Sequence, residues 1–268
     1  MASFSVVSNI ASSNAQANLS TSQAGMHKAI SRLSSGFRLN QSGDDSAGLA
    51  VANKYRNDQV ILNQGIRNAN DGLSKLQIKD GALQNIASLL DRMSTLATQA
   101  SNAASDADIS KLSAEYNSVA AEIDREAAVA GMTTSAGFSV FVSSETTAAN
   151  GKVTGTIGAV EVADLAITQT TFTTVSEAAT ALGQVKTAVS SLGGVQNTVG
   201  TLQNRLQFAI GLAQSQVVNT QAAEGRIRDA DIAEESANMT KFNILTQSGI
   251  AALAQANQST SSVLALLR

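Results

Sequence analysis

Few residues of this chain have the types and spacing that catalysis or metal binding requires. His27 is the only histidine and cysteine is absent, which excludes thiol chemistry and metal sites built from thiolates or paired imidazoles. The sequence also lacks the His-Glu-x-x-His spacing of zinc peptidases, a nucleophile elbow and a phosphate-binding glycine loop. Asp44 and Asp45 are adjacent carboxylates, but they precede a helical pattern, and Asp44 or Asp45 is predicted to lie near its N-terminal cap. We therefore expect no enzymatic activity, no metal and no cofactor.

The composition predicts long helices rather than a compact core of bulky rings. Proline and tryptophan are absent, and aromatic residues make up 3% of the 268 residues. Because proline breaks helix interiors, its absence permits long uninterrupted helices. Apolar or small residues from Leu62 to Ala100 recur at steps of three and four, which places them on one helix face. We expect a helix from Asp45 to Ala100 and, after a short turn, an antiparallel helix whose apolar face runs from Ile109 to Ala130.

The charge distribution argues against nucleic-acid and membrane partners. The net charge is −3, and there is no basic stripe of the kind that contacts phosphates. No run of about eighteen apolar residues could span a bilayer, so membrane insertion is not expected. The chain has no basic residue before Lys28 and no apolar stretch typical of a cleaved secretory signal, so no such signal is expected.

Both ends of the chain are free of charge over long stretches. Residues 1–26 and 242–267 contain no charged side chain, yet both keep apolar residues at helical spacing. A solvated helix usually displays Lys and Glu, whereas in a homopolymer one charge recurs in every neighbour and is costly to desolvate. The uncharged ends therefore predict a repeated, buried self-contact. For the N-terminal segment a disordered Ser/Asn-rich tail is the alternative.

Residues 131–175 differ in character from the rest. Five glycines separate short β-branched runs at 138–142, 152–157 and 160–167, and Asn150-Gly151 is a hairpin-turn signal. We expect one small β-region here. The helical pattern resumes from Leu182 to Val217, with Gly193-Gly194 as a point where that helix could bend.

Two motifs near the ends of the chain resemble those of bacterial flagellin. The N-terminal motif combines Leu33-Ser-Ser-Gly36-Phe-Arg38-Leu-Asn40 with Asp44-Asp45-Ser-Ala47-Gly48-Leu-Ala50-Val-Ala-Asn53. The C-terminal motif runs from Arg226-Ile-Arg-Asp229 through Glu234-Glu235-Ser-Ala-Asn238 to Val263-Leu264-Ala-Leu266-Leu267-Arg268. The resemblance covers roughly residues 1–130 and 180–268, and departs at Thr260, where many relatives have a proline.

The resemblance implies a short flagellin without large outer domains. Its fold would be mainly α, a long antiparallel coiled-coil-like helical bundle with a small central β-region and paired terminal helices. Residues 1–44 and 225–268 would form the inner terminal-helix domain, 45–130 and 176–224 the helical trunk, and 131–175 a β-hairpin region at its outer surface. The connector would contain Gly36, Arg38, Asp44 and Asp45. The self-assembly core would consist of apolar residues from both ends: Phe4, Val7, Ile10, Leu33, Phe37, Phe242, Leu245, Leu253, Val263 and Leu267.

The same resemblance implies the function and the partners. The chain would be a secreted structural subunit that assembles with copies of itself into the extracellular filament used for swimming. Export by a type III apparatus would involve a flagellin export chaperone, and assembly would involve the filament cap and the hook-junction proteins. Arg92, Leu96, Gln99 and Glu115 match a patch that binds the flagellin-sensing Toll-like receptor in many flagellins. Positions 94 and 95 carry Ser and Thr in place of an Arg and a Glu common in strongly detected relatives.

Two other functions fit part of the sequence. A hook–filament junction protein resembles flagellin at both ends, but it is usually less similar over residues 44–53. A signalling coiled coil of chemoreceptor type is also proline-poor and rich in Ala and Gln. That class predicts charged helix surfaces throughout and one continuous hairpin, whereas this chain has uncharged ends and a central β-region.

Overall fold

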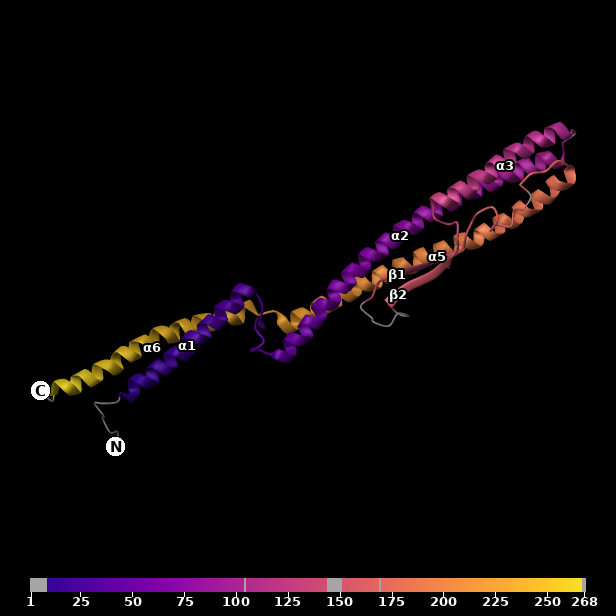
Figure 1. The fold of residues 1–268 in the computed structure, drawn as a ribbon. Helices are drawn as coiled ribbons and strands as arrows, with labels where there is room; N and C mark the ends of the chain where they lie inside the picture. The colour runs from indigo at the N-terminus through magenta and orange to yellow at the C-terminus, as the bar shows by residue number, and fades with distance from the viewer. Residues whose placement is uncertain (1–8, 104, 144–150, 169, 267–268) are drawn as a thin grey trace. The chain divides into compact units, whose positions relative to one another are not determined.

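The computed structural model describes residues 9–103, 105–143, 151–168 and 170–266, with side chains up to residue 259 (Figure 1). The helices are α1 (Ile10–Ser35), α2 (Ser46–Ser101), α3 (Asp106–Val129), α5 (Val175–Arg228) and α6 (Ile232–Leu266). The strands are β1 (Ala136–Phe141) and β2 (Lys152–Ile157). The fold is therefore mainly α with one small sheet, which confirms the predicted fold class.

The chain divides into two compact units, one of residues 1–57 and 219–268 and the other of residues 58–218. The first unit extends further along α2 and α5 than the terminal-helix domain expected from the sequence. Leu39 accounts for part of this extension, because its side chain is buried and lies against Gly48 in the first turn of α2. The end of the connector thus holds the start of α2 within this unit.

In the first unit, α1 and α6 lie side by side and antiparallel (Figure 1). The amide of Asn9 donates to the carbonyl of Ala256 at one end of the pair, and Arg32 contacts Glu235 at the other. Glycines permit the close approach: a Cβ at Gly25 would lie 2.6 Å from the ring of Phe242, and one at Gly249 would lie 3.3 Å from Leu19. The inner stripe of α1 consists of small and medium residues at heptad-like spacing: Ser12, Ala15, Leu19, Ser22, Met26, Ala29 and Leu33.

The second unit contains the hydrophobic core of the molecule. The predicted apolar face of α2 is buried there, from Leu62 through Leu83 and Leu90 to Ala100, with Ile66 and Leu73 partly buried. The predicted face of α3 packs into the same core with Ile109, Tyr116 and Ile123. α5 completes the core with nine buried residues of its own: Ala178, Ala181, Val185, Ala188, Leu192, Val199, Leu202, Leu206 and Ala213.

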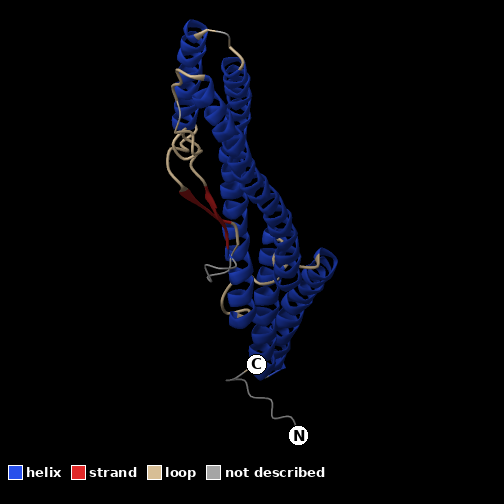
Figure 2. Cartoon of the chain, turned by 90° about the vertical axis from the view of Figure 1, so that its right-hand side faces the viewer, coloured by secondary structure: helices blue, strands red, loops and turns tan. Residues whose placement is uncertain are grey.

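The two strands form an antiparallel hairpin in which Ser139 pairs with Thr154 (Figure 2). Asn150 of the expected turn signal lies outside the described residues, and the carbonyl of Gly151 accepts hydrogen bonds from Val142 and Ser143. α5 begins at Val175, before the predicted start, and runs through Gly193-Gly194 without interruption.

The third predicted β-branched run, residues 160–167, is a series of turns and not a strand. Its backbone is satisfied outside a sheet: the Val160 N–H donates to the carbonyl of Met132 and the Val162 N–H to the carboxylate of Asp124. Leu165 and Ile167 are buried. The apolar residues of the run therefore close the core beside α3 instead of extending the sheet.

Two glycines of α2 allow β1 and the residue after it to pack closely against this helix. A Cβ at Gly65 would collide with the carbonyl oxygen of Val142, and a Cβ at Gly72 would lie 2.8 Å from the Val140 side chain. The two glycines are seven residues apart, so they lie on one face of the helix. The hairpin can therefore lie directly on the α2 backbone.

Candidate functional site

The described side chains offer no candidate metal centre. Within residues 9–259, outside the gaps, no group of three or more His, Asp or Glu is placed to hold a metal ion. None of the described helices is long and apolar enough to cross a membrane. Tyr116 is fully buried against Phe172, with ring centroids 5.2 Å apart, and burial raises the pKa of its hydroxyl to about 12. This phenol is a packing group rather than an acid–base group at neutral pH.

The connector after α1 is joined to the link between α5 and α6. Gly36 ends α1 in the left-handed conformation, at φ 74°, and its N–H donates to the carbonyl of Arg32. Phe37 then pairs with Asp229 as an isolated antiparallel bridge. The Arg38 N–H donates to the carbonyl of Arg228 at 2.6 Å. Backbone hydrogen bonds therefore couple the two connecting segments of the first unit.

Side chains reinforce this junction. The guanidinium of Arg228 lies 4.0 Å above the ring of Phe37, within cation–π distance. Arg38 donates to the carbonyl of Ile227 at 2.8 Å. Sequence reasoning named Phe37 as an apolar assembly residue, but here its half-buried ring is covered by Arg228 of the same chain.

The two adjacent carboxylates of the connector have different roles. Asp45 accepts from the N–H groups of Ala47 and Gly48, and so caps α2. Asp44 instead lies 2.6 Å from the ammonium of Lys28 and 3.9 Å from the guanidinium of Arg32. The hydrogen bond from Lys28 holds the pKa of the Asp44 carboxyl below its usual value.

Arg32 links this pair to the last helix. Its guanidinium lies 2.8 Å from Glu235, whose side chain is 9% exposed. A network of Lys28, Asp44, Arg32 and Glu235 therefore ties α1, the connector and α6 together. The pairing of Arg32 with Glu235 was not predictable from local spacing, because the two residues are 203 positions apart in the chain.

The other nine predicted assembly residues fall into three groups. Leu33, Phe242 and Leu253 are half-buried between α1 and α6, whereas Ile10 and Leu245 are 67% and 42% exposed. Phe4, Val7 and Leu267 lie outside the described residues, as does the side chain of Val263.

The outer faces of α1 and α6 carry further large apolar side chains that the pairing leaves uncovered. Four of them are absent from the predicted set and are 44–58% exposed: Ile30, Ile232, Ile244 and Ile250. Sequence spacing could not separate these residues from the inner stripe, because apolar residues occur on more than one face of each helix.

The predicted receptor patch is only partly at the surface. Arg92 of α2 and Glu115 of α3 are each about half exposed and form an ion pair, and Gln99 is exposed. Leu96 is fully buried in the helical core. It can support the patch only by positioning its neighbours.

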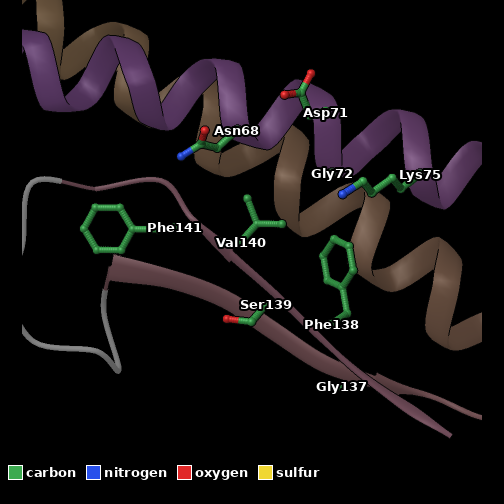
Figure 3. Close-up of a pocket in the computed structure, with 9 residues that line it drawn as sticks. All are labelled: Asn68, Asp71, Gly72, Lys75, Gly137, Phe138, Ser139, Val140 and Phe141. Carbon is green, nitrogen blue, oxygen red and sulfur yellow. The ribbon is translucent and has the colours of Figure 1, made fainter.

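The second unit has a groove between α2 and β1 that the sequence did not indicate (Figure 3). Its volume is about 430 Å³. Its lining comes from one side of α2 and from most of β1: Asn68, Asp71, Gly72, Lys75, Gly137, Phe138, Ser139, Val140 and Phe141.

Comparison with known proteins finds one family over most of the chain. The model of the bacterial flagellin N-terminal helical region matches residues 6–146, and that of the C-terminal helical region matches residues 182–267. The flagellar filament 33 kDa core protein of Treponema phagedenis is 34% identical and the flagellin of Halalkalibacterium halodurans 36% identical. The flagellin of Bacillus subtilis is 31% identical. Each of these three alignments covers 97% of this chain and 98% of the relative.

Proposed function

Since this chain belongs to the bacterial flagellin family and is a structural subunit of the flagellar filament, we propose that the α1–α6 pair is the part of it that forms the filament core. The near-complete matches to flagellins favour this function over a hook–filament junction protein and over a signalling coiled coil.

The observation that supports this proposal is the uncovered apolar surface of the paired helices. Ile30 on α1 and Ile244 and Ile250 on α6 are roughly half exposed, and no charged side chain occurs between Lys241 and Arg268. Removing apolar surface from water contributes about 25 cal/mol per Å². Copies of the same pair can cover the α6 face with Ile244 and Ile250 without desolvating a charge of that segment.

Several features of the assembly belong to this proposal. We assign the core tube to residues 1–44 and 225–268, the trunk to 45–130 and 176–224, and the outer surface to residues 131–175. The filament lies outside the cell, so the chain is exported. A flagellin export chaperone, the filament cap and the hook-junction proteins are the partners that this route requires.

Polymerisation of purified protein tests the assignment of the core. We expect wild-type protein to form long filaments visible by electron microscopy. Changing both Ile244→Gln and Ile250→Gln should raise the critical concentration for assembly at least about tenfold, because two apolar contacts per subunit are lost. Gln247→Ala, at an exposed polar position of the same helix, is the matched control and should assemble as wild type. Normal assembly of the double variant would contradict the assignment.

A second surface supports a role in immune detection. Arg92 and Gln99 are seven residues apart on α2, and the Arg92–Glu115 pair presents both charges at the surface. We propose that these three residues form a recognition surface for the flagellin-sensing Toll-like receptor. Ser and Thr at positions 94 and 95 supply no charge to that contact.

A further inference from the structure

The outward face of α5 differs from the other helix surfaces of the second unit. Between Glu177 and Glu224 this helix carries only two charged side chains, Lys186 and Arg205. By contrast, α3 carries eight charged side chains in 24 residues. A helix with so few charges on an otherwise charged unit is suited to a contact that excludes water.

Phe208 is the most prominent residue of this face. Its side chain is 80% exposed, more than any other large apolar residue among those described. Leu212, one helical turn further on, is 62% exposed. Two residues before Phe208, Leu206 is fully buried, so Phe208 points away from the core.

The position of Phe208 is fixed by its own chain. Arg205 donates from its guanidinium to the carbonyl of Thr154 on β2 at 2.9 Å, and Leu202 packs over Gly155 of the same strand. Arg205 and Leu212 are seven residues apart, so the attachment to β2 lies on the same side of α5 as the Phe208–Leu212 pair and orders the helix backbone beside the ring. An aromatic side chain on a backbone that is already ordered requires no backbone ordering on binding, which favours its use as an interface anchor.

The groove between α2 and β1 offers exposed aromatic surface and no net charge, which suits an apolar insert such as Phe208. Figure 3 shows Phe138 and Val140 pointing from β1 toward α2, with Phe141 further along the strand. Both phenylalanines are half-buried and keep exposed ring surface. Asp71 and Lys75 on the α2 side of the groove carry opposite charges, so an uncharged insert meets no net charge there.

We propose that Phe208 and Leu212 of one subunit insert into the α2–β1 groove of a second copy of this chain. An open helical polymer requires a heterologous contact, in which two different surfaces of each subunit fit one another. A contact of Phe208 with Phe208 would instead be isologous and would close a dimer. Edge-to-face or offset contact with Phe138 and Phe141 is the arrangement that aromatic rings prefer. The inference rests on the proposed polymerisation and assigns to it a specific pair of surfaces.

A double-mutant cycle on the assembly reaction tests this pairing. Phe208→Ala removes the anchor, and Gly137→Leu fills the groove. The Gly137 backbone is not left-handed and no atom lies within 4 Å of its Cβ position, so its own subunit accommodates the side chain. Each variant should raise the critical concentration at least about tenfold, as truncated interface anchors do.

The critical concentration of the double variant shows whether Phe208 and the groove make the same contact. If the anchor occupies the groove, either single change already removes the contact, so the second change has little further effect. The critical concentration of the double variant should then stay near that of the single variant that assembles less well. Effects that multiply would show that the two surfaces make separate contacts, and would overturn the pairing. Gln207→Ala and Gly81→Leu, at an exposed position beside the anchor and at an open glycine of α2, are the matched controls.

Different results would contradict the proposed function and the pairing of Phe208 with the groove. Absence of filaments from wild-type protein would overturn the proposed function. Wild-type filaments together with normal assembly of Phe208→Ala would overturn only the pairing. Monomers of both single variants should keep the wild-type helical signal and unfolding midpoint, since Phe208 is exposed and Gly137 has open space.

Crosslinking identifies the occupant directly. p-Benzoylphenylalanine at position 208 keeps an aromatic ring in the contact, and filaments grown from a mixture with ¹⁵N-labelled wild-type protein distinguish a neighbour from the same chain. We expect labelled peptides that contain residues 68–75 or 137–141 to be captured. Capture of a neighbour's α5, or of peptides of the same chain alone, would overturn the proposal. The same probe at position 207 should not capture the groove.

Discussion

At the scale of single residues, the carboxylate of Asp44 shows how a contact within the connector becomes sensitive to pH. Its side chain is 13% exposed, whereas that of its partner Lys28 is 55% exposed. The hydrogen bond from Lys28 lowers the pKa of Asp44, so the stabilisation is fully present above the ordinary carboxyl pKa and is lost as the pH falls through the lowered value. The pair is worth on the order of 1 kcal/mol, because one partner is largely solvated.

Asp44→Asn should therefore lower the dissociation temperature of filaments at neutral pH, and it should lower it less at acidic pH. The difference from wild type should stay constant above the ordinary carboxyl pKa and shrink as the pH falls through the lowered pKa of Asp44, since wild-type Asp44 is then protonated as well. Scanning calorimetry of filaments across this range measures it. Asp91→Asn, at an exposed position of α2, serves as the control. A difference that grows as the pH falls would contradict the sign.

The receptor patch is also a prediction at residue scale. Arg92→Ala should lower the potency of purified monomer in receptor reporter cells by about tenfold, because a charge-assisted hydrogen bond contributes about 1.5–3 kcal/mol. Arg125→Ala removes an exposed arginine of α3 outside the patch and should signal as wild type. Wild-type activation should itself be weaker than that of relatives with charges at positions 94 and 95. Unchanged signalling by Arg92→Ala would mean that this arginine only solvates the helix.

At the scale of elements, glycines decide where a strand can lie on a helix. Gly65→Ala would place a methyl group against the carbonyl oxygen of Val142, whereas no atom lies within 4 Å of a Cβ at Gly81. Overpacking of this kind costs about 1–3 kcal/mol, and replacing an exposed helical glycine by alanine stabilises by about 0.5–1 kcal/mol. The two substitutions on α2 should therefore change the free energy of unfolding in opposite directions. Urea unfolding followed by circular dichroism measures both, and equal effects would show that the hairpin does not need Gly65.

These elements also show what the sequence could predict. The apolar faces of α2 and α3 were predicted correctly because burial along a helix repeats at a spacing that is visible locally. Residues 160–167 have the composition of a strand, but Asp124 and Met132 satisfy their backbone and no third strand forms. The groove was not predictable, because it depends on α2 and β1 meeting across more than sixty residues of sequence. Leu96 was assigned to the surface by resemblance, although its spacing from Met93 and Ala100 marks it as part of the buried face.

At the scale of the whole molecule, the two units differ in how much apolar surface they bury. The second unit contains the extended core of α2, α3 and α5. In the first unit, α1 buries only Ala29 fully and the described part of α6 only Glu235. Regions with few buried apolar contacts unfold locally at low free energy. The family motifs thus lie mainly in the unit that buries less apolar surface.

We therefore predict that the terminal helices α1 and α6 are largely unfolded in the monomer and become stable helices only in the polymer. Isolated helices are marginal in water, and Ser, Asn and Thr reduce helix propensity further. Pairing covers one face of each helix and leaves Ile10, Ile244 and Ile250 exposed, so ordering gains most of its free energy from neighbouring subunits. A chain whose ends are unfolded can also pass through a narrow export channel without first unfolding a stable rod.

Amide hydrogen exchange on monomer and filament measures this coupling. We expect rapid exchange of α1 and α6 in the monomer, strong protection of both in the filament, and protection of the core residues of α2, α3 and α5 in both forms. Deleting residues 242–268 should leave a soluble, helical protein that no longer polymerises, because the second unit keeps its own core while the uncharged half of the assembly surface is gone. Strong protection of both terminal helices in the monomer would show that their pairing is stable without neighbours. Normal filaments from the truncated protein would show that assembly does not pass through α6.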